Sequence, residues 1–210
     1  RYDAAGRLVE TAEWAAGAVL RRTLYAHDAL GGRTVSAQDL DLDGRIGWTG
    51  SDRIASNDVR YVKADGDWWR ESAAWESGAD ASAELVFTGS TRTRLTGLGA
   101  SGPHGTLAAE TVAVDRRGNA TVSRLWRNGA VSVRETAVPG SSVSKLAVSV
   151  RGLAVTNRTS AGVVTSTEYD ALGRPVAQFD GRGNRTSYAY DARGRIVSAT
   201  DAAGNVTKFG

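Results

Sequence analysis

The chain has 210 residues and a formal net charge of +3, and 41% of its residues are hydrophobic, which is enough for a packed core and argues against disorder. It contains no cysteine, which excludes disulfides, thiolate nucleophiles and cysteine-based zinc sites. Its 25 glycines against 3 prolines favour tight turns between strands that keep their N–H donors.

Charge and hydropathy indicate the partners to expect. The arginines of the basic half, residues 115–210, recur at intervals and form no cluster, so we expect no nucleic-acid partner. Apolar runs stay short of the roughly 18 residues that a membrane span needs. Because the chain begins at Arg1 with no initiator methionine or signal-peptide pattern, we interpret it as a fragment of a larger protein.

Residues 1–33 contain two copies of one turn-forming phrase. Tyr2–Arg7 reads Tyr-Asp-Ala-Ala-Gly-Arg, and His27–Arg33 is a divergent copy with His for Tyr and one additional Gly. In each copy the Asp can accept backbone N–H bonds at the start of a type I turn, and the Gly can take the following positive φ. We predict a hairpin turn at both places and treat residues 1–33 as a first group of repeats.

The segment between these turns has two interpretations. Thr11–Leu24 carries four alanines, which favour a helix, although Gly17 costs about 1 kcal/mol relative to Ala within one. The repeat instead predicts a strand at Arg7–Glu13, a turn at Trp14–Gly17 and a return strand at Ala18–Tyr25. We prefer the hairpin, because tertiary packing usually overrides weak propensity.

Residues 34–114 are predicted to form longer, decorated hairpins, beginning with an acidic segment. Asp39, Asp41 and Asp43 take positions 1, 3 and 5 of the first half of a calcium loop, and Gly44 takes position 6, where the chain bends. Oxygen ligands on three acids suit Ca²⁺. The sequence therefore predicts a possible calcium cofactor here.

The second half of this calcium motif departs from the pattern. Position 12 is Gly50 where Glu is usual, so Asp52 is the nearest later acid, and Arg45 is expected to contribute its backbone carbonyl. The alternative is a strand edge whose acids point outward and pair with Arg45 or Arg53.

The same region is rich in tryptophan, which suggests a second kind of site. Exposed aromatic rings can stack on sugars, whereas large aromatics more often fill β cores. Adjacent tryptophans in a strand point to opposite faces, so at most one of the pair can join a given platform. The candidate carbohydrate-binding residues are Trp48, Trp68, Trp69 and Trp75.

Turns and loops divide the remainder of the middle region. Asp65-Gly66 predicts a two-residue hairpin turn, and loops are expected at Ser77–Ala83 and Gly97–Gly105. His104, in the second loop, could serve a serine nucleophile, but the chain has no Gly-x-Ser-x-Gly elbow, and we interpret it as an exposed loop residue. We predict no catalytic residue and no enzymatic activity.

Residues 115–162 are predicted to be divergent hairpins. Asp115–Thr121 carries a second phrase, Asp-x-x-Gly-Asn-x-Thr. Asn128-Gly129 is the strongest two-residue turn signal in the chain, and Arg151-Gly152 is a weaker one.

Residues 163–210 carry the most regular repeat. The Tyr-Asp phrase of Tyr169–Arg174 returns 21 residues later at Tyr190–Arg195, and the second phrase of Asp180–Thr186 returns 21 residues later at Asp201–Thr207. Each period supplies two turns and two short strands. Their glycines should have positive φ: Gly173, Gly183, Gly194 and Gly204.

The register of these strands follows from the period. Side chains alternate between the faces of a strand, so Thr186 and Tyr188 should share a face with Thr207 and Phe209. Such hairpins cannot bury an apolar face alone and gain stability by stacking on their neighbours.

These phrases resemble the RHS/YD-repeat family, which includes bacterial polymorphic toxins, insecticidal toxin-complex subunits and teneurins. The resemblance is close over residues 1–33 and 163–210 and covers one phrase at 115–121. It implies an all-β fold of tandem antiparallel hairpins that form a curved or spiralling sheet strip, a segment of an RHS-type β-shell. In toxin members such a shell encloses a cytotoxic domain; no match to the family's self-cleaving region is present.

Two functions from different classes follow from these observations. The first is a non-enzymatic scaffold, secreted or on the cell surface and of bacterial origin as the resemblance implies, whose partners are neighbouring repeats and an enclosed domain. The alternative is a surface module that binds glycans through the tryptophan-rich middle.

Overall fold

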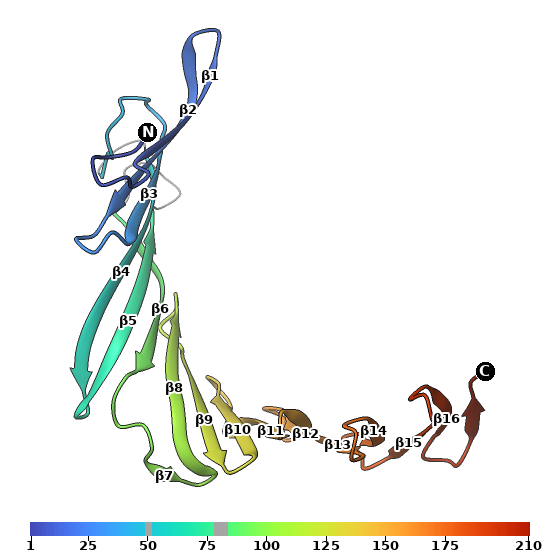
Figure 1. Ribbon diagram of the computed structural model, residues 1–210. Helices are drawn as coiled ribbons and strands as arrows, with labels where there is room; N and C mark the ends of the chain where they lie inside the picture. The colour runs from blue at the N-terminus through green and yellow to red at the C-terminus, as the bar shows by residue number, and fades with distance from the viewer. Residues whose placement is uncertain (49–51, 78–83) are drawn as a thin grey trace. The chain divides into compact units, whose positions relative to one another are not determined.

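The computed structural model describes residues 1–48, 52–77 and 84–210 (Figure 1). In these ranges the regular elements are seventeen β-strands, and the paired strands run antiparallel, which confirms the predicted all-β class. The chain forms two compact units, residues 1–96 with 113–119 and residues 97–112 with 120–210. Within the described ranges, no helix has the length and apolar character needed to cross a membrane.

The first unit is built from six strands that pair in chain order. Each strand pairs with the next along the chain. The strands are β1 (Glu10–Ala15), β2 (Ala18–His27), β3 (Arg33–Asp39), β4 (Arg53–Ala64), β5 (Asp67–Glu76) and β6 (Val86–Arg94).

The first hairpin settles the choice between helix and strand. β1 and β2 pair from Glu10 opposite Leu24 to Ala15 opposite Ala18, so the hairpin prediction is confirmed and the helix is excluded. The turn is shorter than predicted: Ala16 and Gly17 form it, with φ of 49° and 81°. Two consecutive positive φ values match the right-handed twist of the strands that the turn joins.

Strand alternation gives the first unit two unlike faces. One face carries a buried cluster of Leu24, Val35, Ala37 and Ile54, against which Ile46 packs from the segment after β3. The other carries polar residues such as Thr23, Ser36 and Gln38, which neighbour one another across β2 and β3. The buried cluster therefore holds the acidic segment that follows β3.

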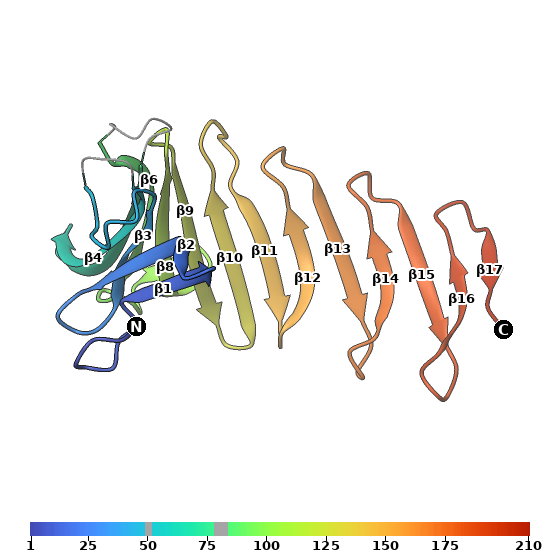
Figure 2. The ribbon, with the colours of Figure 1, turned by 90° about the horizontal axis from the view of Figure 1, so that it is seen from above.

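The second unit contains a short hairpin and a strip of neighbouring strands. Two-residue β7 (Ser101–Gly102) pairs with the start of β8 (Gly105–Asp115). From β9 to β17 each strand pairs with the next, as Figure 2 shows. These strands are β9 (Ala120–Asn128), β10 (Val131–Ala137), β11 (Lys145–Val150), β12 (Leu153–Arg158), β13 (Val164–Tyr169), β14 (Pro175–Phe179), β15 (Arg185–Tyr190), β16 (Ile196–Thr200) and β17 (Val206–Lys208).

The core of the second unit is centred on Trp126. Its ring lies in a buried cluster with Leu107 and Val133. An ideal Cβ on Gly102 would lie 2.1 Å from this ring, so only glycine fits there without a shift. His104 packs edge-on against Trp126 at 6.4 Å between ring centroids and is half-buried, so its interpretation as an exposed loop residue is wrong.

The predicted turns are largely confirmed, with one shift in position. Asp65-Gly66 and Arg151-Gly152 have positive φ at both residues, as two-residue turns require. At Asn128-Gly129 the turn lies one residue later, because Asn128 pairs with Val131 and leaves Gly129-Ala130 between them. Gly129 has φ of 56°, so a glycine at the first central position gives a type II′ turn.

The two predicted loops have different outcomes. In the Ser77–Ala83 prediction, residues 78–83 lie outside the described residues. The Gly97–Gly105 segment is irregular, as predicted, except for the two residues of β7.

The predicted register of the C-terminal repeats is confirmed. Tyr188 lies opposite Ala199, which lies opposite Thr207, so the three share one face. By alternation Thr186 and Phe209 lie on the same face. The 21-residue period thus preserves the face of each side chain.

Candidate functional site

The turns of the repeat are organised by their aspartates. At Asp170, Oδ1 accepts the backbone N–H groups of Leu172 (2.9 Å) and Arg174 (3.0 Å). The Asp170 carbonyl accepts the N–H of Gly173 at 3.0 Å, and Gly173 has φ of 79°. One carboxylate oxygen thus satisfies two donors that a loop would otherwise leave to water.

The residue after the glycine closes the turn in one of two ways. In the Tyr-Asp phrases an Arg donates Nε to Oδ2 of the Asp, at 2.7 to 2.8 Å for Asp3–Arg7, Asp170–Arg174 and Asp191–Arg195. In the second phrase an Asn donates Nδ2 to the same oxygen, at 2.8 to 2.9 Å for Asp115–Asn119, Asp180–Asn184 and Asp201–Asn205. The four glycines predicted to have positive φ in residues 163–210 all do, from 79° to 85°.

These contacts lower the pKa of the turn aspartates below the ordinary value. For Asp170 and Asp191 the largest cause is the backbone N–H of Arg174 or Arg195. For Asp180 and Asp201 it is the side-chain amide of Asn184 or Asn205. The fold therefore favours the ionised form of each aspartate.

The tyrosine of the phrase links neighbouring strands. The Tyr169 hydroxyl donates to the carbonyl of Ala154 at 2.9 Å, and the Tyr190 hydroxyl donates to that of Pro175 at 2.7 Å. The two acceptors are themselves 21 residues apart. Arg174 also lies over the Tyr190 ring at 4.6 Å, so one arginine closes its own turn and contacts the next repeat.

The acidic segment after β3 brings three predicted ligands together. One carboxylate oxygen from each of Asp39, Asp41 and Asp43 lies within 4.8 Å of the others. Asp39 is buried and the other two are exposed. Asp39 Oδ2 accepts the N–H of Gly44 at 2.9 Å and pairs with Arg22 Nη1 at 3.1 Å.

The two other predicted metal residues take part in the loop backbone. Asp52 is buried, and its two carboxylate oxygens accept the N–H groups of Leu40 (3.1 Å) and Gly47 (2.8 Å). Asp52 thus clamps the two ends of the acidic segment and does not belong to the group of three. The N–H of Arg45 donates to Asp43 Oδ1 at 2.8 Å.

Sequence reasoning missed Arg22, which sits at the centre of this network. Arg22 Nη1 also donates to the Leu42 carbonyl at 3.0 Å, and Nε pairs with Glu10 at 3.2 Å. The signal available was its place on β2, two residues before the buried Leu24 and so on the same face. Its partner Asp39 lies 17 residues away, and local patterns do not specify such a pair.

The four tryptophans lie in different surroundings. Trp48 and Trp68 are 53% and 47% exposed, whereas Trp69 is buried and Trp75 packs edge-on against Phe87 at 6.2 Å. Trp68 pairs with Lys63 near one end of β4, while Trp48 precedes the other end of that strand. A rise of about 3.3 Å per residue along β4 keeps the two exposed rings from forming one platform.

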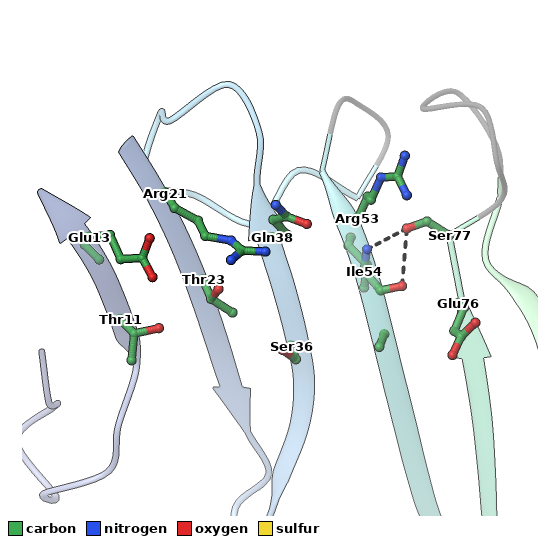
Figure 3. A pocket seen from close by; sticks show the side chains of 12 residues that line it. Thr11, Glu13, Arg21, Thr23, Ser36, Gln38, Arg53, Ile54, Glu76 and Ser77 are labelled. Carbon is green, nitrogen blue, oxygen red and sulfur yellow. Dashed lines mark hydrogen bonds between the residues drawn. The ribbon is translucent and has the colours of Figure 1, made fainter. Parts of the chain in front are cut away.

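A polar hollow of about 530 Å³ lies on the other face of the first unit (Figure 3). Its charged lining residues are Glu13, Arg21, Arg53 and Glu76. At one side Ser77 Oγ accepts the N–H of Ile54 at 2.6 Å and lies 3.3 Å from its carbonyl. The hollow suits a hydrated or polar surface better than an apolar ligand.

The strands and their turns define a class, an array of antiparallel hairpins closed by a recurring Asp-x-x-Gly turn. The family model of the RHS Repeat matches residues 169–206, which span the two Tyr-Asp turns and the strands between them. This match assigns that segment to the RHS/YD-repeat family and supports the chain's membership of it. A search of curated proteins found no match.

Proposed function

We propose that the chain is a non-enzymatic structural scaffold, a wall segment of a larger RHS/YD-repeat protein that encloses or presents a neighbouring domain. The observation that carries the proposal is the recurring turn, in which Asp, Gly and Arg or Asn serve the backbone of the hairpin itself. Using these side chains for turn closure suits a wall, in which each repeat stabilises the next.

The location and partners belong to the same proposal. We place the parent protein outside the cell or on its surface, of bacterial origin, and give the chain two kinds of partner: adjacent repeats and the neighbouring domain. The polar hollow of the first unit supports contact with a hydrated protein surface, because its glutamates and arginines can pair with charges of either sign.

Limited proteolysis of the full-length parent protein tests the enclosure. We expect the neighbouring domain to resist protease in the parent and to be digested faster when Gly194→Val disrupts a wall turn. Thr165→Val, at an exposed strand position, is the matched control and should leave protection unchanged. Equal digestion in the parent and in the Gly194→Val variant would contradict the proposal.

The alternative function, carbohydrate binding, is supported by the exposure of Trp48 and Trp68. Exposed indole rings can stack on sugars. A glycan array tests it: binding that is lost in Trp68→Ala and kept in Tyr61→Ala, an exposed aromatic of the same hairpin, would favour this function over the scaffold.

A further inference from the structure

One carboxylate oxygen of the acidic segment is buried without a hydrogen-bond partner. The Asp39 side chain has no exposed surface, and its Oδ1 finds no partner among the described residues, while Oδ2 is held by Gly44 and Arg22. Buried carboxylate oxygens are normally paired, because desolvation without compensation is costly. Asp39 Oδ1 therefore has the character of an atom that awaits a ligand.

The neighbouring acids supply further ligands at a suitable spacing. The three carboxylate oxygens of Asp39, Asp41 and Asp43 lie within 4.8 Å of one another. Oxygens bound to one calcium ion at 2.3–2.6 Å lie at most about 5 Å apart. The group can thus surround a single ion of this size with little rearrangement.

The charge at the group is only partly neutralised by Arg22. Its guanidinium pairs with Asp39 through Nη1 and with Glu10 through Nε, so one positive charge is shared between two carboxylates. Three carboxylates this close repel one another unless more positive charge is present. A divalent cation would supply that charge at the point where the oxygens converge.

The segment is also held in place from outside the group. Asp52 fixes the backbone at Leu40 and Gly47, and Ile46 packs against the buried cluster of the first unit. A loop that is already ordered loses less entropy when it binds an ion.

We propose that residues 39–45 form a calcium site in which Asp39 contributes Oδ1, Asp41 and Asp43 each contribute a carboxylate oxygen, and Arg45 contributes its backbone carbonyl. The site goes beyond the scaffold function, and its test does not depend on the parent protein. With a glycine where position 12 usually has Glu, the expected dissociation constant falls in the weak range of about 10⁻⁴–10⁻³ M.

Calorimetric titration of the 210-residue chain with CaCl₂, together with thermal unfolding in the presence of the ion, tests the site. We expect one ion per chain and a rise in Tm. Asp41→Asn and Asp43→Asn each remove one ligand charge at an exposed position and should weaken binding about tenfold. Asp58→Asn, an exposed acid on β4, is the matched control and should bind calcium as the unsubstituted chain does.

The titration of the unsubstituted chain alone is decisive if a variant fails to fold. The absence of calcium-dependent heat and of any Tm shift at about 10 mM ion, well above the expected dissociation constant, would overturn the proposal. Equal effects of MgCl₂, or undiminished binding by both Asp41→Asn and Asp43→Asn, would reduce the site to general screening of acids and would overturn it as well.

Discussion

Each turn of the regular repeat depends on one carboxylate with two separate tasks. Asp191 Oδ1 accepts the backbone N–H groups of Arg193 and Arg195, both at 2.9 Å, while Oδ2 pairs with the Arg195 guanidinium. The negative charge strengthens all three contacts, because charge-assisted hydrogen bonds exceed neutral ones. The protonation state of these aspartates should therefore affect the stability of the hairpins.

Acidification should destabilise the repeats through these groups. Because folding lowers the pKa of Asp191, its contribution is full above the unfolded pKa of about 3.9 and is lost as pH falls through the lower folded pKa. Urea unfolding of the unsubstituted chain and of Asp191→Asn should show a less stable variant at about pH 6 and a smaller difference at about pH 2.5. A difference that stays constant with pH would contradict this prediction.

The turn glycine makes a separate contribution through its backbone. Gly194 has φ of 82°, and the nearest atom to an ideal Cβ there is Arg174 Nη1 at 3.8 Å, so a side chain meets strain but no clash. Gly194→Val should cost about 1–2 kcal/mol in urea unfolding, and Gly194→Asn less, since Asn tolerates this region. Ala192→Val, at an exposed position of the same turn, should stay within about 0.5 kcal/mol.

At the scale of the strand, β2 shows how alternation separates two adjacent arginines. Arg21 faces the polar hollow, whereas Arg22 pairs with the buried Asp39. Removing one partner of a buried ion pair leaves the other charge without compensation. The two positions should therefore respond very differently to the same substitution.

Arg22→Met should lower the free energy of unfolding by about 3 kcal/mol, as expected for breaking a buried pair. Arg21→Met keeps the same change in chemistry on the exposed side and should stay within about 0.5 kcal/mol. Urea unfolding of both variants checks the prediction. Equal losses would mean that the Arg22–Asp39 pair adds no more than a surface arginine does.

The same strand shows what could be predicted from the sequence and why the rest could not. The β1–β2 hairpin and the turn glycines are encoded locally by Asp, Gly and alternation, so their prediction succeeded. The turn after Asn128 was misplaced by one residue, because Asn-Gly and Gly-Ala suit different turn types and strand register chose between them. The Arg22–Asp39 pair and the Asp52 clamp join positions distant in sequence, which a local pattern does not specify.

At the scale of the molecule, both units extend by pairing each strand with its sequence neighbour. From β9 to β17 the connections are short turns that alternate between the two edges of the strip (Figure 2). The repeat was predicted from its period, whereas the division into two compact units had no signal in composition. The predicted division at residues 33, 114 and 162 stays a prediction.

The link between Tyr190, Pro175 and Arg174 has a consequence for how such arrays can change in length. Deleting residues 170–190 removes two strands, two turns and one tyrosine together, and it joins Tyr169 to the next Asp turn in the original phase. This variant should keep its β circular-dichroism spectrum and unfold cooperatively. Deleting residues 180–190 instead places an Arg-type turn at the edge that held an Asn-type turn and should lower the unfolding midpoint much further. Recombination within such genes would then be tolerated in whole steps of 21 codons, so length polymorphism should be quantised while the strip itself stays the same.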